Sequence, residues 1–122
     1  RMRFLKQDIR RLELGERFDV VLALFHVMSY VTSNDDVMNV LQRVREHTAP
    51  GGIFIFDFWY GPAVLTQRPE TRILRRTKDD ISLTRIAEPV LQANENTVDV
   101  HYEILVEQGN DSERICEKHS MR

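Results

Sequence analysis

Two short stretches with almost no polar residues constrain the fold of this chain more than any other feature of its sequence. Residues 18–27 read FDVVLALFHV and residues 52–58 read GIFIFDF. Strands that are apolar on both sides are typical of a parallel sheet whose two faces are both covered by helices. We therefore predict that residues 20–24 and 53–56 form adjacent, parallel and buried strands.

The segment between these stretches has the pattern of an amphipathic helix over residues 34–47. Ser33 precedes it as an N-cap residue, and Pro50 with Gly51 is expected to end it. Apolar residues recur at the spacing of one helical face, at Val37, Val40, Leu41 and Val44. Two parallel strands joined by a helix form a right-handed crossover, so the pattern predicts an α/β fold.

The character of the sequence changes after about residue 65. Polar and apolar residues alternate, with breaks at KDD, ANEN and QGND, which indicates about four antiparallel strands with one wet face. We therefore divide the chain into residues 1–65, an α/β part, and residues 66–122, an antiparallel extension. Cys116 falls in this extension, where we expect a buried or half-buried structural thiol.

Composition narrows the classes of function. The 122 residues are 42% apolar and 30% charged, with a net charge of -2, so no basic stripe for nucleic acid is expected. A single cysteine excludes an internal disulfide, and no HExxH spacing occurs among the four histidines, so no metal is expected. No apolar run spans a bilayer, and no signal-peptide pattern is visible, which favours a cytoplasmic protein without a membrane partner.

Polar and aromatic residues gather directly after the second apolar strand. Asp57, Trp59 and Tyr60 follow it before Gly61. Ligands bind outside the carboxyl ends of parallel strands, and a pocket wall needs apolar area with a few polar groups. We predict that these three residues line a substrate pocket. The alternative is that the two rings only pack the extension onto the sheet.

The order of three motifs resembles a known family. QDIRRL, then FDVVLALFHVMSYV, then LQRVREHTAPGGIFIFDFWYGPAV is similar to the second half of a class I S-adenosylmethionine-dependent methyltransferase domain. The small sugar N-methyltransferases are the most similar members. The resemblance implies part of a Rossmann-like sheet, followed by an antiparallel β meander that covers the acceptor or joins a homodimer.

The resemblance also implies the cofactor and the residues that contact it. S-adenosylmethionine would be bound by Asp8, which ends a short strand and accepts from the adenine amino group, and by Ile9 beside it. Leu24 and Phe25 would lie along the methionine part of the cofactor. The alternatives are that Asp8 forms or caps a turn, and that Leu24 and Phe25 belong to the core.

His26 and Tyr30 are the candidate catalytic residues. The resemblance places both near the acceptor, and a histidine can accept a proton near neutral pH. A histidine in an apolar run is, alternatively, a structural group with its hydrogen bonds satisfied.

The implied function is S-adenosylmethionine-dependent methyl transfer to a small-molecule acceptor, such as an amino sugar or another amine. The acidic-Gly-x-Gly-x-Gly loop of the family lies in no part of this sequence, so we expect the chain to be a piece of a longer enzyme and inactive alone. Two other classes stay open: a nucleotide-binding oxidoreductase with the same βαβ pattern, and a non-catalytic oligomerisation or binding module.

Overall fold

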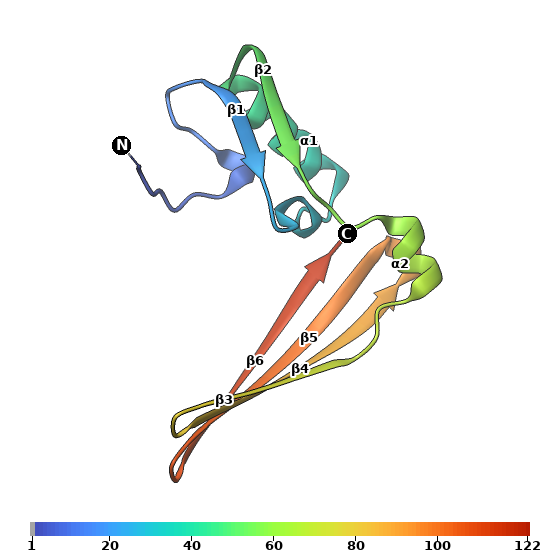
Figure 1. The fold of residues 1–122 in the computed structure, drawn as a ribbon. Coiled ribbons are helices and arrows are strands. Elements are labelled where there is room, and N and C mark those ends of the chain that lie inside the picture. The colour runs from blue at the N-terminus through green and yellow to red at the C-terminus, as the bar shows by residue number, and fades with distance from the viewer. Residues whose placement is uncertain (1) are drawn as a thin grey trace. The chain divides into compact units, whose positions relative to one another are not determined.

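A computed structural model describes residues 2–122, which form two compact units that divide after Trp59. The first unit contains η1 (Ile9–Arg11), β1 (Phe18–Ala23), η2 (Val27–Tyr30), α1 (Asn34–His47) and β2 (Thr48–Phe56). The second contains α2 (Gly61–Gln67), β3 (Arg72–Lys78), β4 (Ile81–Gln92), η3 (Ala93–Glu95), β5 (Thr97–Gln108) and β6 (Asp111–Met121) (Figure 1). α2 was not predicted from the sequence.

The first unit is the predicted βαβ element. β1 and β2 pair in parallel, with Val20 beside Ile53 and Leu22 beside Ile55, and α1 connects them. α1 begins as expected, because the Ser33 hydroxyl accepts a hydrogen bond from the N–H of Asp36. The predicted strand pairing and the bounds of the helix are confirmed.

The residues that end α1 differ from the expected ones. The helix ends at His47, where Thr48 is the C-cap, and Pro50 lies inside β2. The Thr48 hydroxyl donates to the carbonyl of Val44, which satisfies one of the last helical acceptors. The helix thus ends where it was predicted to end, but the expectation that Pro50 and Gly51 stop it was wrong.

Burial of the two strands is one-sided. Val40 and Val44 of α1 are buried in the core, and Val21 and Phe54 pack against this cluster. The other face keeps its apolar side chains half exposed, at Val20 (51%), Leu22 (56%), Ile53 (56%) and Ile55 (50%). The expectation of strands buried on both faces is wrong here, because no element of the first unit covers the face opposite α1.

Residues 2–8 do not form the short strand that was expected to end at Asp8. They have no regular secondary structure, and Phe4 is 86% exposed. A strand needs a neighbour for its backbone groups, and the sheet described in this unit has only β1 and β2. Asp8 instead precedes η1 as its N-cap residue.

The second unit contains the predicted meander, with four antiparallel strands in the order β3-β4-β5-β6. Residues directly opposite each other share a face, so the register defines the two faces. One face is mostly apolar and the other mostly polar. Cys116 lies on the polar face and is exposed, so the prediction of a buried or half-buried thiol was wrong.

Candidate functional site

The carboxyl ends of β1 and β2 lie side by side, because the strands are parallel and Ala23 pairs with Phe56. The segments that follow these ends are therefore neighbours as well. The N–H of Asp57 extends the pairing by donating to the carbonyl of Ala23 at 3.3 Å. This edge of the sheet is where a ligand is expected in an open parallel sheet.

Asp57 holds the turn that leaves β1. Its carboxylate accepts the N–H of His26 at 2.8 Å and the N–H of Phe25 at 3.2 Å. Both of these residues are left-handed, with φ of 63° for Phe25 and 61° for His26. This conformation costs about 1 to 2 kcal/mol for a residue with a side chain, so two in succession need strong partners. The charged carboxylate supplies them.

The same turn presents the ring of His26. Its Nδ1 lies 3.8 Å from Oδ2 of Asp57, and its ring meets that of Trp59 edge to face with centroids 6.4 Å apart. The side chains of His26 and Asp57 are about half exposed. The structure thus brings together three of the predicted site residues: His26, Asp57 and Trp59.

Ser29 is a further member of this site that the sequence analysis missed. It is 1% exposed, and its hydroxyl accepts a hydrogen bond from the N–H of Trp59 at 3.0 Å. This bond fixes the segment after β2 against η2. A serine among the apolar residues of HVMSY was the available signal, because a buried hydroxyl needs a partner.

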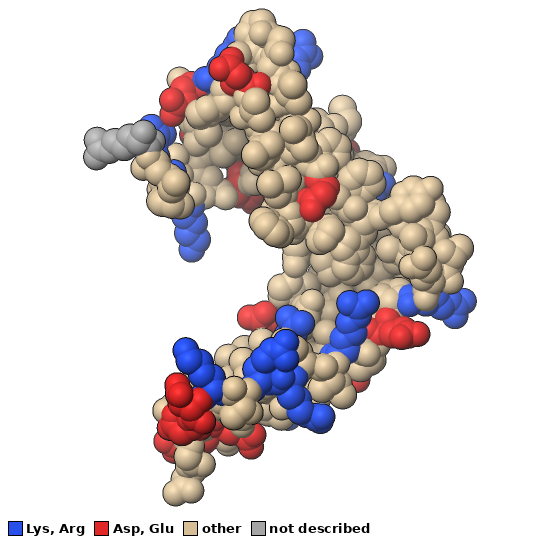
Figure 2. Space-filling view, in the orientation of Figure 1, with Lys and Arg blue, Asp and Glu red and all other residues tan. Residues whose placement is uncertain are grey.

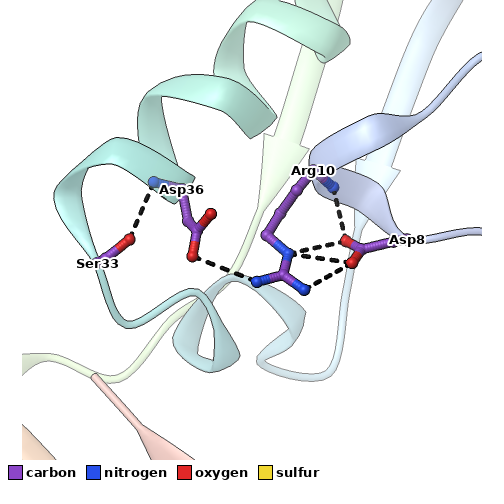
Figure 3. A network of polar contacts seen from close by, with 4 residues as sticks. All are labelled: Asp8, Arg10, Ser33 and Asp36. Atoms are coloured by element: carbon purple, nitrogen blue, oxygen red, sulfur yellow. Dashed lines mark hydrogen bonds and ion pairs between the residues drawn. The ribbon is translucent and has the colours of Figure 1, made fainter.

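Asp8 lies in a polar network at the start of η1 (Figure 3). Its carboxylate accepts from the N–H of Arg10 and from the Arg10 guanidinium, with Nη2 at 2.6 Å. Arg10 also donates to Asp36 at 3.3 Å, so it joins η1 to the first turn of α1. The hydrogen bonds from the Arg10 side chain lower the pKa of Asp8 from 3.8 to about 2.

The other predicted site residues are Ile9, Leu24, Phe25, Tyr30 and Tyr60. Ile9 is partly buried and packs against the core of the first unit. Leu24 is 44% exposed, Phe25 88% and Tyr30 49%. Tyr60 begins the second unit as the N-cap of α2 and is exposed.

Two negative findings apply to residues 2–122. Within them, no three His, Cys, Asp or Glu side chains gather as possible metal ligands. None of the helices described is both long and apolar enough to cross a membrane.

Comparison with known proteins gives sequence relatives of a single kind, while no protein-family model matches the chain. The chain is 28% identical over 97 residues to dTDP-4-amino-2,3,4,6-tetradeoxy-D-glucose N,N-dimethyltransferase of Saccharopolyspora spinosa. It is 24% identical over 98 residues to dTDP-3-amino-3,4,6-trideoxy-alpha-D-glucopyranose N,N-dimethyltransferase of Streptomyces venezuelae. Each match covers 80% of this chain but only 39% and 40% of the relatives, so the chain spans about two fifths of their length.

The solved structures agree with this class. The whole chain superposes on 48% of an S-adenosylmethionine-dependent methyltransferase from Clostridium acetobutylicum, with a TM-score of 0.79 and 24% identity. The fold is therefore that of an S-adenosylmethionine-dependent methyltransferase, with part of the Rossmann-like sheet and the antiparallel extension, as the sequence predicted. The sequence relatives within this class are amino-sugar N,N-dimethyltransferases, which confirms the resemblance stated from the motifs.

Proposed function

We propose that this protein transfers methyl groups from S-adenosylmethionine to the amino group of a sugar carried by a nucleoside diphosphate. The observation that carries the proposal is the similarity, over four fifths of the chain, to two enzymes named as N,N-dimethyltransferases of dTDP-amino sugars. The His26 turn at the carboxyl edge of β1 and β2 supports it, because that edge is where this type of sheet binds ligands.

Four residues are proposed to contact the cofactor. Asp8 remains ionised far below neutral pH, so its carboxylate is an acceptor for the adenine amino group at any physiological pH. Ile9 would support the adenine with its partly buried side chain. Leu24 and Phe25 follow β1, and the 88% exposed ring of Phe25 offers apolar area to the methionine part.

The chemistry requires little of the protein beyond alignment and removal of a proton. The sulfonium of S-adenosylmethionine supplies an already activated methyl group when it is bound. His26 and Tyr30 would orient the acceptor amine, and His26 would take the proton that the nitrogen loses when the methyl carbon exchanges its bond to sulfur for a bond to nitrogen. Trp59 and Tyr60 would line the acceptor pocket.

For Asp57 we propose a role that differs from direct substrate binding. Its two oxygens accept the N–H groups of Phe25 and His26, which are the residues proposed to face cofactor and acceptor. Asp57 would therefore act as a positioning residue for both, with its exposed side adding negative charge near a cationic ligand.

Kinetics of the intact protein test this function. The enzyme is given S-adenosylmethionine with a labelled methyl group and a dTDP-amino sugar, and the N-methylated product is measured by mass spectrometry. We expect His26→Asn to lower kcat by about 100-fold, which is typical of a lost general base. The exposed His101→Asn is the matched control and should leave kcat unchanged. An unchanged kcat for His26→Asn would contradict the catalytic role.

We also propose that residues 1–122 alone do not methylate. The glycine-rich loop of the family is not among them, and two or three lost polar contacts, at about 1 to 3 kcal/mol each, weaken binding by several orders of magnitude. Calorimetry with S-adenosylmethionine compares this chain with the intact protein. Micromolar binding by the chain would refute this expectation, and absence of binding by both would refute the methyltransferase proposal.

A cytoplasmic homodimer is proposed for the assembled protein, with the apolar face of the meander as the joining surface. Ile104, Val106 and Ile115 lie on this face and keep part of their side chains exposed. Sedimentation velocity measures the mass. A monomer at high concentration would exclude the dimer and favour the alternative, in which this face covers the acceptor.

A further inference from the structure

Three hydrogen bonds form a closed circuit through the turn after β1 and the segment after β2. The N–H of His26 donates to the carboxylate of Asp57 at 2.8 Å, and the N–H of Trp59 donates to the hydroxyl of Ser29 at 3.0 Å. The N–H of Ser29 closes the circuit by donating to the carbonyl of His26 at 2.9 Å. Each segment thus supplies the side chain that holds a backbone N–H of the other.

The two side chains of this circuit differ in burial. Ser29 is 1% exposed, whereas the side chain of Asp57 is 44% exposed. Ser29 also has a fixed position, because Met28 before it and Val31 after it belong to the buried core of the first unit. The hydroxyl of Ser29 therefore ties the N–H of Trp59 to the core rather than to another loop.

Satisfaction of a backbone N–H does not by itself account for this bond. Residues 57–59 have no regular secondary structure, and Phe58 beside Trp59 is 56% exposed. Water is an adequate acceptor for backbone N–H groups at such a surface. A bond to a buried hydroxyl instead restricts where Trp59 lies.

Charge contributes little to this restraint. Uncharged surface prevails on the face of the first unit that Figure 2 shows. The carboxylate of Asp57 already accepts the N–H groups of Phe25 and His26. The segment at Trp59 is held by a neutral hydroxyl, whose position depends on packing and not on salt.

The circuit also sets two aromatic rings against each other. The rings of His26 and Trp59 meet edge to face, with their centroids 6.4 Å apart. Each of these residues has its backbone N–H bound to a side chain of the other segment, so the contact of the rings depends on both bonds.

We propose that Ser29 is a positioning residue, whose hydroxyl sets the ring of Trp59 against that of His26. The consequence for catalysis rests on the proposed function, in which His26 takes a proton and Trp59 lines the acceptor pocket. Displacement of an aligning group by about 1 Å is enough to cost about 100-fold in rate. Ser29 would thereby act on the acceptor without contacting it.

NMR of residues 1–122 tests the structural part of the proposal. Ser29→Ala removes the acceptor, and Ser29→Cys retains a side chain of similar shape that is only a weak acceptor. In both variants hydrogen exchange at the N–H of Trp59 should become about tenfold faster, the equivalent of one hydrogen bond. The nuclear Overhauser effects between the rings of His26 and Trp59 should be lost.

Thr48→Val is the matched control. It removes the hydroxyl that donates to the carbonyl of Val44, a bond in the same unit but away from the His26 turn. Hydrogen exchange at Trp59 and the contact of the rings should be the same as in the unaltered chain.

Kinetics of the intact protein give the functional readout. Both Ser29 variants should raise KM for the dTDP-amino sugar by about tenfold, and KM for S-adenosylmethionine by less than about twofold. A lower amount of folded enzyme reduces the measured rate but changes neither KM. Thr48→Val should therefore leave both KM values unchanged.

Several results would overturn the role of Ser29. Unchanged hydrogen exchange at Trp59 in Ser29→Ala would show that the bond does not hold this segment. Faster exchange with the ring contact intact would show that the serine only satisfies a backbone N–H. An active protein with unchanged KM, or with an equal rise of KM in Thr48→Val, would also contradict the proposal. If the intact protein methylates no amine, the proposed function fails, and the NMR measurements still decide whether Ser29 positions Trp59.

Discussion

The two units of the chain present polar groups in different places because their strands pair differently. In the first unit the parallel strands β1 and β2 carry apolar side chains along their length, and the polar groups follow their ends, at His26 and Asp57. In the second unit the antiparallel strands alternate, and charges lie along a face, as in the pairs of Lys118 with Asp99 and of Arg114 with Glu103. A parallel pair thus concentrates chemistry at an edge, whereas a meander spreads it over a surface.

The difference in strand pairing also determines how sensitive each unit is to single substitutions. The first unit depends on a few close contacts: the approach of the backbones at Gly52, the buried His47 and the turn held by Asp57. The meander depends on long continuous pairing, with twelve registered pairs between β4 and β5. Single substitutions should therefore destabilise the first unit more than the second.

The largest effect is expected from Gly52→Ala. A Cβ at this position would lie 2.8 Å from the carbonyl oxygen of Asp19 and 2.7 Å from Cγ2 of Thr48, so β1 and β2 would have to move apart. Overpacking of this kind costs about 2 to 3 kcal/mol. Urea unfolding followed by the fluorescence of Trp59, the one tryptophan, reports on the first unit.

Gly61→Ala is the matched control for that measurement. A Cβ at Gly61 would meet no atom within 4 Å, and the residue begins α2 in the second unit. We expect a change below about 0.5 kcal/mol. Equal destabilisation by the two substitutions would refute the close backbone contact at Gly52.

The next effect concerns His47, which is 7% exposed. Its Nε2 accepts the N–H of Leu14 at 2.9 Å, and its Nδ1 lies 2.7 Å from the carbonyl oxygen of Arg43, so Nδ1 must carry the proton and the ring is neutral. His47→Ala leaves the N–H of Leu14 without this partner and removes a buried ring, and we expect a loss of about 2 kcal/mol in the free energy of unfolding.

The exposed His101 of β5 is the corresponding control in the meander. His101→Ala should change the stability by less than about 0.5 kcal/mol, as for other surface positions. If both histidine variants lost the same free energy of unfolding, the first unit would be no more sensitive to substitution than the second.

Much of this fold follows from short-range patterns in the sequence. The apolar runs, the spacing of Val37 to Val44 and the Ser33 cap sufficed for the βαβ element, and the alternation after residue 65 sufficed for the meander. One-sided burial of β1 and β2 could not be predicted, since it depends on which elements pack against the sheet. The helix end at His47 was predicted, but Thr48 as its C-cap was not, because Pro50 and Gly51 were the stronger local stop signals.

The sequence was enough to predict which residues belong to the candidate site, but not which contacts join them. Residue types at the strand ends indicated His26, Asp57 and Trp59 as neighbours, and the structure brings them together. The contacts of Asp57 with backbone N–H groups depend on two left-handed residues that no local pattern of Phe25 and His26 would suggest.

A smaller effect on stability is expected from Asp57→Ala. The carboxylate is half exposed, so loss of its hydrogen bonds to Phe25 and His26 should cost about 1 kcal/mol, the lower end for a charged acceptor. Under the proposed function, kcat of the intact protein should fall by more than the loss of folded protein explains, since the His26 ring would no longer be held.

A second substitution separates the turn from other roles of Asp57. Phe25→Gly removes the cost of the left-handed conformation at one residue. When Phe25→Gly is added to Asp57→Ala, it should therefore restore part of the lost stability. The same substitution in the unaltered chain should stabilise the protein less. Strictly additive effects of the two changes would show that Asp57 does not hold this turn.

The smallest effect is a shift in titration, and it compares one aspartate from each unit. Asp8 has a pKa lowered to about 2 by hydrogen bonds from Arg10, two residues away, while the pKa of Asp99 is lowered by Ser120 and Lys118 from the neighbouring strand. A depressed pKa means that Asp8 stabilises the fold above pH 3.8, and that this contribution is lost as the pH falls toward 2. Arg10→Ala removes the guanidinium but keeps the backbone N–H bond, so the pKa of Asp8 should return only part of the way to 3.8. Carbon NMR of the carboxyl groups measures both aspartates at once.

Asp99 is the control for this measurement. The pKa of Asp99 should stay unchanged in Arg10→Ala, because the partners of Asp99 lie in the other unit. Lys118→Ala should raise the pKa of Asp99 and leave that of Asp8 unchanged. If either variant shifted the pKa of both aspartates, the two units would not titrate independently.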